Sequence, residues 1–286
     1  MPARHDPAQP PQDSGQPGPP RLTDRAALAR HRARAAADPV TWMHDLVRDE
    51  VEDRLAGINR SFTAPAVVTG ATGFWAAAFP GARVVEDAPR LDLAPGAHDL
   101  VIHALALHWA DDPVGQIIQS ARALKPDGLF LAALPGGDSL GPLRAALAQA
   151  EVELTGGLSP RVAPMGEIRD LGGLVQRAGL ALPVADQITQ LVSYGGLIAL
   201  ARDLRGMGET NALDRRLRRP TRRSVILRAA QILQDIAPDP GEPGRIRVGF
   251  DIVFLTGWAP ADNQPKPLRP GSATHRLADA LNQRTE

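Results

Sequence analysis

Residues 67–74, VVTGATGF, contain two glycines, follow a proline and precede a short apolar run. An apolar, β-branched strand that leads into glycines and then into helix-forming residues is the setting in which α/β proteins hold a dinucleotide or S-adenosylmethionine (SAM). Only Gly70 and Gly73 are present, and no acidic residue lies beside them. The pattern indicates a cofactor loop, and the alternative is a strand that ends in a flexible turn.

Two acidic residues follow the next apolar run, ARVVED. Glu86 or Asp87 lies slightly less than ~20 residues beyond the glycine loop, where dinucleotide-binding folds carry the carboxylate that accepts the ribose hydroxyls. An acidic residue after a strand is also common in a solvated turn. Both interpretations stay open.

Histidine and tryptophan lie where a third apolar run ends. His103 falls within the run DLVIHALALHW, and His108 and Trp109 lie near its exit, the place where open α/β sheets meet their ligands. His108 could serve as a general base and Trp109 as a stacking wall for an adenine or an acceptor. The alternative is that the pair packs the strand end and orients the following loop.

The sequence gives little indication of a metal site and excludes cysteine chemistry. The seven histidines show neither HxxxH nor HExxH spacing, so no metal site is predicted, and only a triad assembled from distant segments is left open. The absence of cysteine excludes disulfides, iron–sulfur clusters, thiolate zinc sites and a cysteine nucleophile.

Alternating strands and helices must position these residues. We predict strands at 66–69, 83–85, 99–104 and 129–134, with helices at 74–79 and 113–124 between them. That order implies a doubly wound, mostly parallel sheet with right-handed crossovers. Residues 125–128, KPDG, predict a turn in which the glycine supplies a positive φ.

Helices are also predicted on both sides of this core. Before it lie 22–37 and 39–60, the second capped by Asp38 and carrying an apolar stripe. After it lie 141–154, 170–178 ending at Gly179, 192–204 and 224–236, followed by a late strand pair or edge strand at 247–258. The stripe of the second helix comprises Trp42, Leu46, Val51, Leu55 and Ile58.

Composition and the N-terminal segment limit the class of protein. The 286 residues include 32 basic and 32 acidic side chains, and this zero net charge argues against nucleic acid as the main partner. No apolar run reaches the ~18 residues of a membrane span. Residues 1–21 lack the apolar core of a secretory signal and predict a disordered tail. We therefore expect a cytoplasmic protein.

Several segments together carry a family resemblance. DLVIHALALHW, the following DDP and ALKPDGLFLAALPGGDSL resemble the central part of class I SAM-dependent methyltransferases. SPRVAP at 159–164, RDLGGLVQRAGL, DLRGMGETNAL and QPKPLRPGSA narrow this to the methyltransferase-like assembly factors of respiratory complex I, including alphaproteobacterial homologues. The match runs in order over residues 22–282. The mitochondrial relative is associated with arginine hydroxylation of a quinone-site subunit, so fold and reaction need not agree.

This sequence departs from the methyltransferase pattern at the cofactor loop. Thr69 stands near the position of the usual carboxylate, and the middle glycine is lost, so a neutral hydroxyl replaces a charge-assisted bond. Too few residues separate Gly70 from Asp99 for the family's extra helix and strand, because one βαβ unit alone takes roughly 30 residues. We expect a first half shortened by one crossover.

Three further segments suggest contacts with a partner. The basic run at 215–223, RRLRRPTRR, could dock an acidic surface or lipid head groups, or be a solvated helix end. GMGETN at 206–211 presents Glu209, Thr210 and Asn211 together, either at the site or as the cap of a following helix. The tail at 265–272, with Lys266 and Arg269 between prolines, favours a docking segment.

The resemblance implies a Rossmann-like class I methyltransferase fold, with a shortened first half, an N-terminal helical cap and a helical insertion near the C-terminus. We expect a tail at 1–21, the cap at 22–62, the main domain at 63–262 and a Pro-rich tail at 263–286. The candidate cofactor residues are Thr69, Gly70, Gly73, Glu86, Asp87, His108 and Trp109, and the catalytic candidates are His108 and Glu209.

The expected function is assembly or stability of respiratory complex I, with weak or no SAM binding. The partners would be complex I subunits or assembly intermediates, met in the cytoplasm or at the cytoplasmic face of the inner membrane. Two alternatives remain: an active SAM-dependent methyltransferase that modifies a protein side chain, and an arginine hydroxylase that acts on a complex I subunit.

Overall fold

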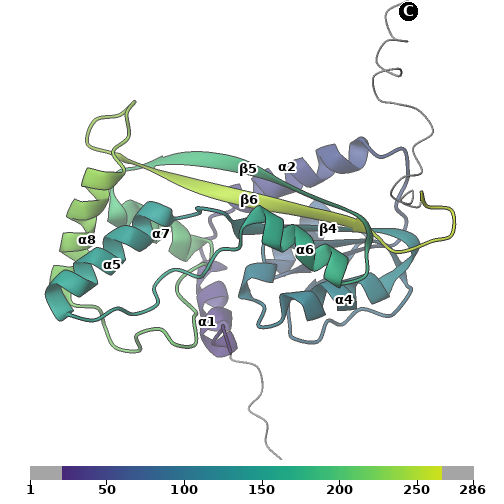
Figure 1. The fold of residues 1–286 in the computed structure, drawn as a ribbon, viewed down its shortest axis with the longest axis horizontal. Coiled ribbons are helices and arrows are strands. Elements are labelled where there is room, and N and C mark those ends of the chain that lie inside the picture. Colours follow the sequence, from purple (N-terminus) through teal and green to yellow (C-terminus); the bar gives the residue numbers. More distant parts are fainter. Residues whose placement is uncertain (1–20, 266–286) are drawn as a thin grey trace, which may run out of the picture.

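A six-stranded sheet in the order β2-β1-β3-β4-β6-β5 forms the centre of the protein, whose computed structural model describes residues 21–265 (Figure 1). β1 to β4 run parallel, whereas β6 is antiparallel to β4 and to β5. This is the doubly wound, Rossmann-like fold that the sequence predicts. The strands are β1 (Pro65–Thr69), β2 (Arg83–Glu86), β3 (His98–Ala104), β4 (Leu124–Gly136), β5 (Ala181–Tyr194) and β6 (Ile246–Trp258).

Helices cover both faces of this sheet. Alternate residues of β3 and β4 point to opposite sides, so Ile102 packs in one core with α2 and α3 while Val101 packs in another with α4 and α6. The first core continues under α5, α7 and α8. The helices are α1 (Arg25–Ala35), α2 (Trp42–Ala56), α3 (Thr72–Ala78), α4 (Pro113–Ala123), α5 (Gly141–Thr155), α6 (Ile168–Arg177), α7 (Leu197–Gly206) and α8 (Arg223–Ile236), with the short helix η1 (Leu107–Trp109).

The first half of the fold lacks a crossover helix, as the spacing predicts. Residues 87–97 link β2 to β3 without a helix or strand, and β2 ends the sheet on that side. Because β1 lies between β2 and β3, this irregular link passes the end of β1. The start of this link is held by α1, through Arg25 and Arg32, and by α4, through Gln116 and Gln119.

The second half differs from expectation at residues 181–204. A helix at 192–204 is wrong at its start: 181–194 are strand β5, and α7 begins at Leu197, after Gly195 and Gly196. The 247–258 segment is a strand, but it lies between β4 and β5 rather than at an edge. β5 and β6 extend past β4 as a two-stranded ribbon that reaches α8 (Figure 1).

Local caps and turns differ from expectation at two places and agree with it at a third. Helix α2 begins after Thr41, so Asp38 is not its cap, whereas α1 is capped by Asp24, which accepts from the Ala27 amide. Residues 125–128 lie inside β4, at an irregularity in its pairing with β3, rather than in a separate turn, and the positive φ there belongs to Asp127, at +61°, and not to Gly128. Gly179 follows α6 with a φ of +82°, as predicted for its end.

Residues 1–20 and 266–286 lie outside the described part of the chain, and with them most of the expected N-terminal tail and of the 265–272 docking segment. None of the helices between residues 21 and 265 combines the length and the apolar character needed to cross a bilayer.

Close packing between β4 and β6 predicts the effect of a small substitution. A Cβ atom at Gly136 would lie 2.6 Å from Val253 Cγ2 and 3.1 Å from the Gly166 carbonyl oxygen. We expect Gly136→Ala to lower the free energy of unfolding by about 1–3 kcal/mol, because backbone and a buried valine must move. Urea denaturation measures this.

Gly73→Ala is the matched control. A Cβ atom there meets nothing within 4 Å, and the residue lies in α3, so the substitution should be neutral or slightly stabilising. Equal urea midpoints for Gly136→Ala and the unsubstituted protein would contradict the packing argument.

Candidate functional site

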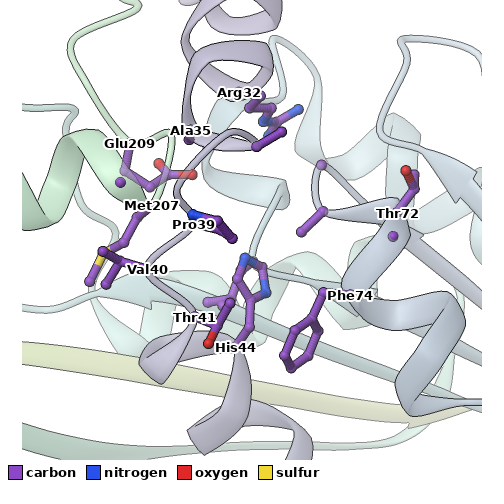
Figure 2. A pocket seen from close by; sticks show the side chains of 16 residues that line it. Arg32, Ala35, Pro39, Val40, Thr41, His44, Thr72, Phe74, Met207 and Glu209 are labelled. Atoms are coloured by element: carbon purple, nitrogen blue, oxygen red, sulfur yellow. The ribbon is translucent and has the colours of Figure 1, made fainter.

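A cavity of about 430 Å³ lies at the carboxyl ends of β1 and β3, and we call it the loop cavity. Figure 2 shows Arg32 from α1, His44 from α2 and Glu209 from the segment after α7 around this space. The glycine loop forms one wall. The cavity is lined by Arg32, Ala35, Ala36, Pro39, Val40, Thr41, His44, Gly70, Ala71, Thr72, Gly73, Phe74, Leu105, Gly206, Met207 and Glu209.

The guanidinium of Arg32 lies directly on the glycine loop. A Cβ atom at Gly70 would come within 2.2 Å of Arg32 Cζ and 2.4 Å of Arg32 Nε. Gly70 is therefore required by a close approach, but the group that approaches is a side chain of the same protein. Gly73 has no such neighbour.

The carboxylate of Asp87 accepts hydrogen bonds from the same Arg32 guanidinium. Arg32 Nη1 donates to Asp87 Oδ1 at 2.6 Å, and Arg25 Nη1 donates to Oδ2 at 3.2 Å. The Asp87 side chain is 2% exposed. Burial alone would raise the pKa of Asp87, but the guanidinium groups of Arg32 and Arg25 outweigh it and hold that pKa below its ordinary value. Asp87 is thus an ionised carboxylate with both oxygens paired.

The other expected cofactor residues lie around this pair. Glu86 is the exposed end of edge strand β2. Thr69 is fully buried, and its Oγ1 accepts from the Ala71 amide at 3.1 Å, so the hydroxyl is engaged with its own loop. At this edge the structure brings together Thr69, Gly70, Gly73 and Asp87, with Asp87 already bound to arginine.

His44 closes the floor of the loop cavity as a neutral ring. Trp75 Nε1 donates to His44 Nδ1 at 3.1 Å, and an indole can only donate, so the His44 proton is on Nε2. Burial lowers the pKa of His44 to about 4. His44 therefore presents a neutral imidazole at pH 7.

Glu209 joins the two residues at the exit of β3. Glu209 Oε2 is 3.0 Å from His108 Nε2 and accepts from Trp109 Nε1 at 2.6 Å. Burial would raise the pKa of Glu209, but His108, Arg32 and the indole N–H together hold it below its ordinary value. Trp109 is only 3% exposed and packs against α1. Its ring is thus part of a core cluster rather than an open stacking wall.

A second cavity of about 170 Å³, the histidine cavity, lies on the far side of Glu209. Met207 and Glu209 line both cavities, so they form the shared wall. Apolar side chains from several elements make up most of the rest of the lining, among them Leu143 and Leu147 of α5 and Phe250 of β6. The arrangement offers one anionic carboxylate at the border of an apolar space.

The 206–211 turn is held against α1. A Cβ atom at Gly208, whose φ is +79°, would lie 3.2 Å from Arg32 Cγ, and His31 Nδ1 is 3.1 Å from the Thr210 carbonyl oxygen. Asn211 does not cap a helix, because its Oδ1 accepts from the Leu213 amide and α8 starts only at Arg223. The turn thus carries Glu209 to the site.

His103, the other histidine considered in the sequence, lies on β3 apart from this site. His103 is fully buried and its Nε2 lies 2.7 Å from Gln116 Oε1, on the α4 side of the sheet. Within residues 21–265 no group of three or more histidine and carboxylate side chains is arranged to hold a metal ion.

Sequence reasoning missed Arg25, Arg32 and His44. One signal was available: Arg25 and Arg32 are seven residues apart in a predicted helix, so they share a face two turns apart. Their partner lies 62 and 55 residues along the chain. Nothing in the local pattern indicates that pairing.

The buried pair predicts a specific non-additivity. Asp87→Asn should lower the free energy of unfolding by about 3–5 kcal/mol at pH 7, because it leaves Arg32 without its charge partner. Arg32→Met with Asp87→Asn should cost less than the sum of the single changes. Urea denaturation of the four proteins measures this, and strictly additive losses would show that the pair does not couple.

The comparisons with known proteins agree with this fold. The model of a methyltransferase domain family matches residues 31–132. Proteins named arginine-hydroxylase NDUFAF5, mitochondrial, are 37% identical over 70% of the chain in Danio rerio and 36% identical over 68% in Homo sapiens. A malonyl-[acyl-carrier protein] O-methyltransferase of Laribacter hongkongensis is 30% identical over 66% of the chain.

The matched part spans 61%, 56% and 61% of the length of these three relatives. Over the matched residues the chain is similar to the NDUFAF5 proteins, and its sheet and helices have the Rossmann-like arrangement of a methyltransferase domain.

Proposed function

We propose that this protein acts in the assembly or stability of respiratory complex I, and that its former cofactor site is filled by its own Arg32. The complex I role follows from the family resemblance of the sequence. The cytoplasm, or the cytoplasmic face of the inner membrane, is the place where it would meet complex I subunits or assembly intermediates.

The position of Arg32 is the observation that supports a degenerate SAM site. Its guanidinium takes the space above Gly70, and both oxygens of Asp87 are already paired with arginine. Thr69 supplies a neutral hydroxyl where the family has a carboxylate. The residues at this edge therefore do not fit SAM in the arrangement seen.

A titration with SAM tests this. We expect no measurable heat of binding for the unsubstituted protein. Arg25→Ala with Arg32→Ala frees Asp87 and the space over Gly70, so SAM affinity should rise into a measurable range. Arg30→Ala with Arg34→Ala removes two exposed arginines of the same helix and should change nothing.

Two results would count against the proposal. A dissociation constant in the micromolar range or tighter for the unsubstituted protein contradicts a degenerate site. Unchanged affinity after removal of Arg25 and Arg32 contradicts the argument that these side chains exclude the cofactor. Circular dichroism of both double variants shows whether the fold is kept.

Arginine hydroxylation is the second candidate function, favoured by the name of the relatives and by the histidine cavity. A guanidinium that entered this apolar space would meet the ionised carboxylate of Glu209, which suits a charge-assisted bond. An active SAM-dependent methyltransferase is the remaining alternative, supported by the fold and by the volume of the loop cavity.

Substitution of Glu209 separates assembly from hydroxylation. Glu209→Gln keeps an oxygen that can accept from Trp109 but removes the negative charge. In a strain lacking this protein, we expect Glu209→Gln to restore complex I activity about as well as the unsubstituted chain does. Glu52→Gln, an exposed residue of α2, is the control for charge.

The opposite result would favour the enzyme. If Glu209→Gln accumulates normally but fails to restore complex I, the carboxylate takes part in chemistry. Mass spectrometry of complex I subunits for an arginine that gains one oxygen would then identify the product.

A further inference from the structure

A groove of about 490 Å³ lies on the outer side of the loop formed by residues 159–165. Three arginines from three separate segments line it: Arg21 before α1, Arg144 on α5 and Arg215 in the segment before α8. We call it the arginine groove. Its apolar lining consists of Leu22, Pro160, Val162, Pro164, Met165 and Leu213.

No carboxylate in the lining of this groove neutralises its arginines. Among the described residues, Arg144 and Arg215 form no ion pair, and Arg144 makes only a long bond of 3.4 Å to the Ser139 carbonyl oxygen. No carboxylate lines the groove. In a chain with 32 acidic and 32 basic side chains, this is a local surplus.

Neighbouring arginines behave differently. Arg161 pairs with Glu151 at 2.9 Å, and Arg216 pairs with Asp24 at 2.9 Å. Arg218 also reaches Asp24, at 3.3 Å. Part of the basic run at 215–223 is therefore committed to holding α1, whereas Arg215 is the member that faces the groove.

Part of the apolar lining forms a recessed floor. Leu213 is buried, and Val162 and Met165 are half-buried, whereas Pro160 and Pro164 are exposed. A surface that inserts into a bilayer projects apolar side chains outward, whereas a recessed floor receives a side chain from outside. Cations beside a floor of this kind suit an anion that carries an apolar group. That geometry favours a protein segment over a lipid surface.

The groove adjoins the histidine cavity. Val162 and Met165 line both spaces, so these two residues form a wall that the groove and the cavity share. A segment bound in the groove would therefore lie close to the cavity that Glu209 lines.

We propose that the arginine groove binds an acidic, partly apolar segment of a partner protein. Carboxylates of that segment bind Arg144 and Arg215, and an apolar side chain between them lies on the recessed floor. The identity of the partner rests on the proposed function, but the chemistry of the segment rests on the groove alone.

Fluorescence anisotropy with a labelled synthetic peptide tests the groove directly. The probe carries two acidic residues on each side of a central leucine. Arg144→Glu with Arg215→Glu should weaken its binding by about tenfold or more, and added salt should weaken binding to the unsubstituted protein. Arg90→Glu with Arg177→Glu makes the same charge change at two exposed arginines outside the groove and should leave binding unchanged.

Two further variants keep the test decisive. Arg144→Gln with Arg215→Gln replaces the charge-reversed pair if melting curves show that the latter unfolds, and it should also lose affinity. A probe with glutamine in place of its acidic residues should not bind. Equal binding by groove and control variants, or no binding by the unsubstituted protein, overturns the proposal.

Vesicles separate a protein segment from a membrane. If vesicles containing an anionic phospholipid bind through Arg144 and Arg215 while the peptide does not, the groove is a lipid site and the proposal is overturned. Co-purification with complex I is measured separately. Peptide binding without co-purification would support the groove as a binding site and contradict complex I as the partner. Co-purification without peptide binding would support complex I as the partner and contradict the groove as a binding site.

Discussion

The ion pair between Arg32 and Asp87 is the constraint on which the site depends. It ties α1 to the ends of β1 and β2, and Gly208 then packs the 206–211 turn against the Arg32 stem. Removing two charges from water costs free energy that their attraction only partly offsets. The pair therefore adds little net stability, but it fixes the position of α1, because moving the two residues apart would leave an unpaired buried charge.

The shortened first half of the fold makes this pairing available. Residues 87–97 cross from β2 to β3 without a helix, so the Asp87 carboxylate and carbonyl oxygen both face α1. Arg25 donates to that carbonyl oxygen at 2.6 Å. Loss of one crossover and acquisition of two arginine contacts thus occur at the same place. Helix α1, from the N-terminal side, therefore lies against the carboxyl end of β2 through Arg25 and Arg32.

Strands β1 to β4 could be predicted from the sequence, because buried parallel strands are continuous β-branched and apolar runs. β5 was missed because its burial alternates only in part, and Leu182, Val184 and Leu191 are apolar residues at exposed positions. The sequence of this edge strand therefore shows no clean period of two. The start of α7 was misplaced for a related reason: Gly195 and Gly196 separate strand from helix, and an apolar pattern alone does not locate that boundary.

The candidate site was predictable only in part. The glycine loop, Asp87, His108 and Glu209 carry local patterns, whereas their partners come from contacts distant in the chain. Glu209 lies 101 residues from His108, and Arg32 lies 55 residues from Asp87. The packing of α1 and of the C-terminal insertion decides which charged residues pair. The periodicity of the sequence does not predict that pairing.

Charge is distributed in two different ways in this protein. At the strand ends, Arg25 and Arg32 face Asp87, and Glu209 is held ionised by its neighbours, so cations and anions are matched. In the arginine groove the cations have no matching carboxylate. A matched interior attracts a charged ligand weakly, because its fields cancel, whereas an unmatched surface steers and orients an oppositely charged partner. The chain's zero net charge therefore conceals a division between matched charges at the strand ends and a positive surface in the arginine groove.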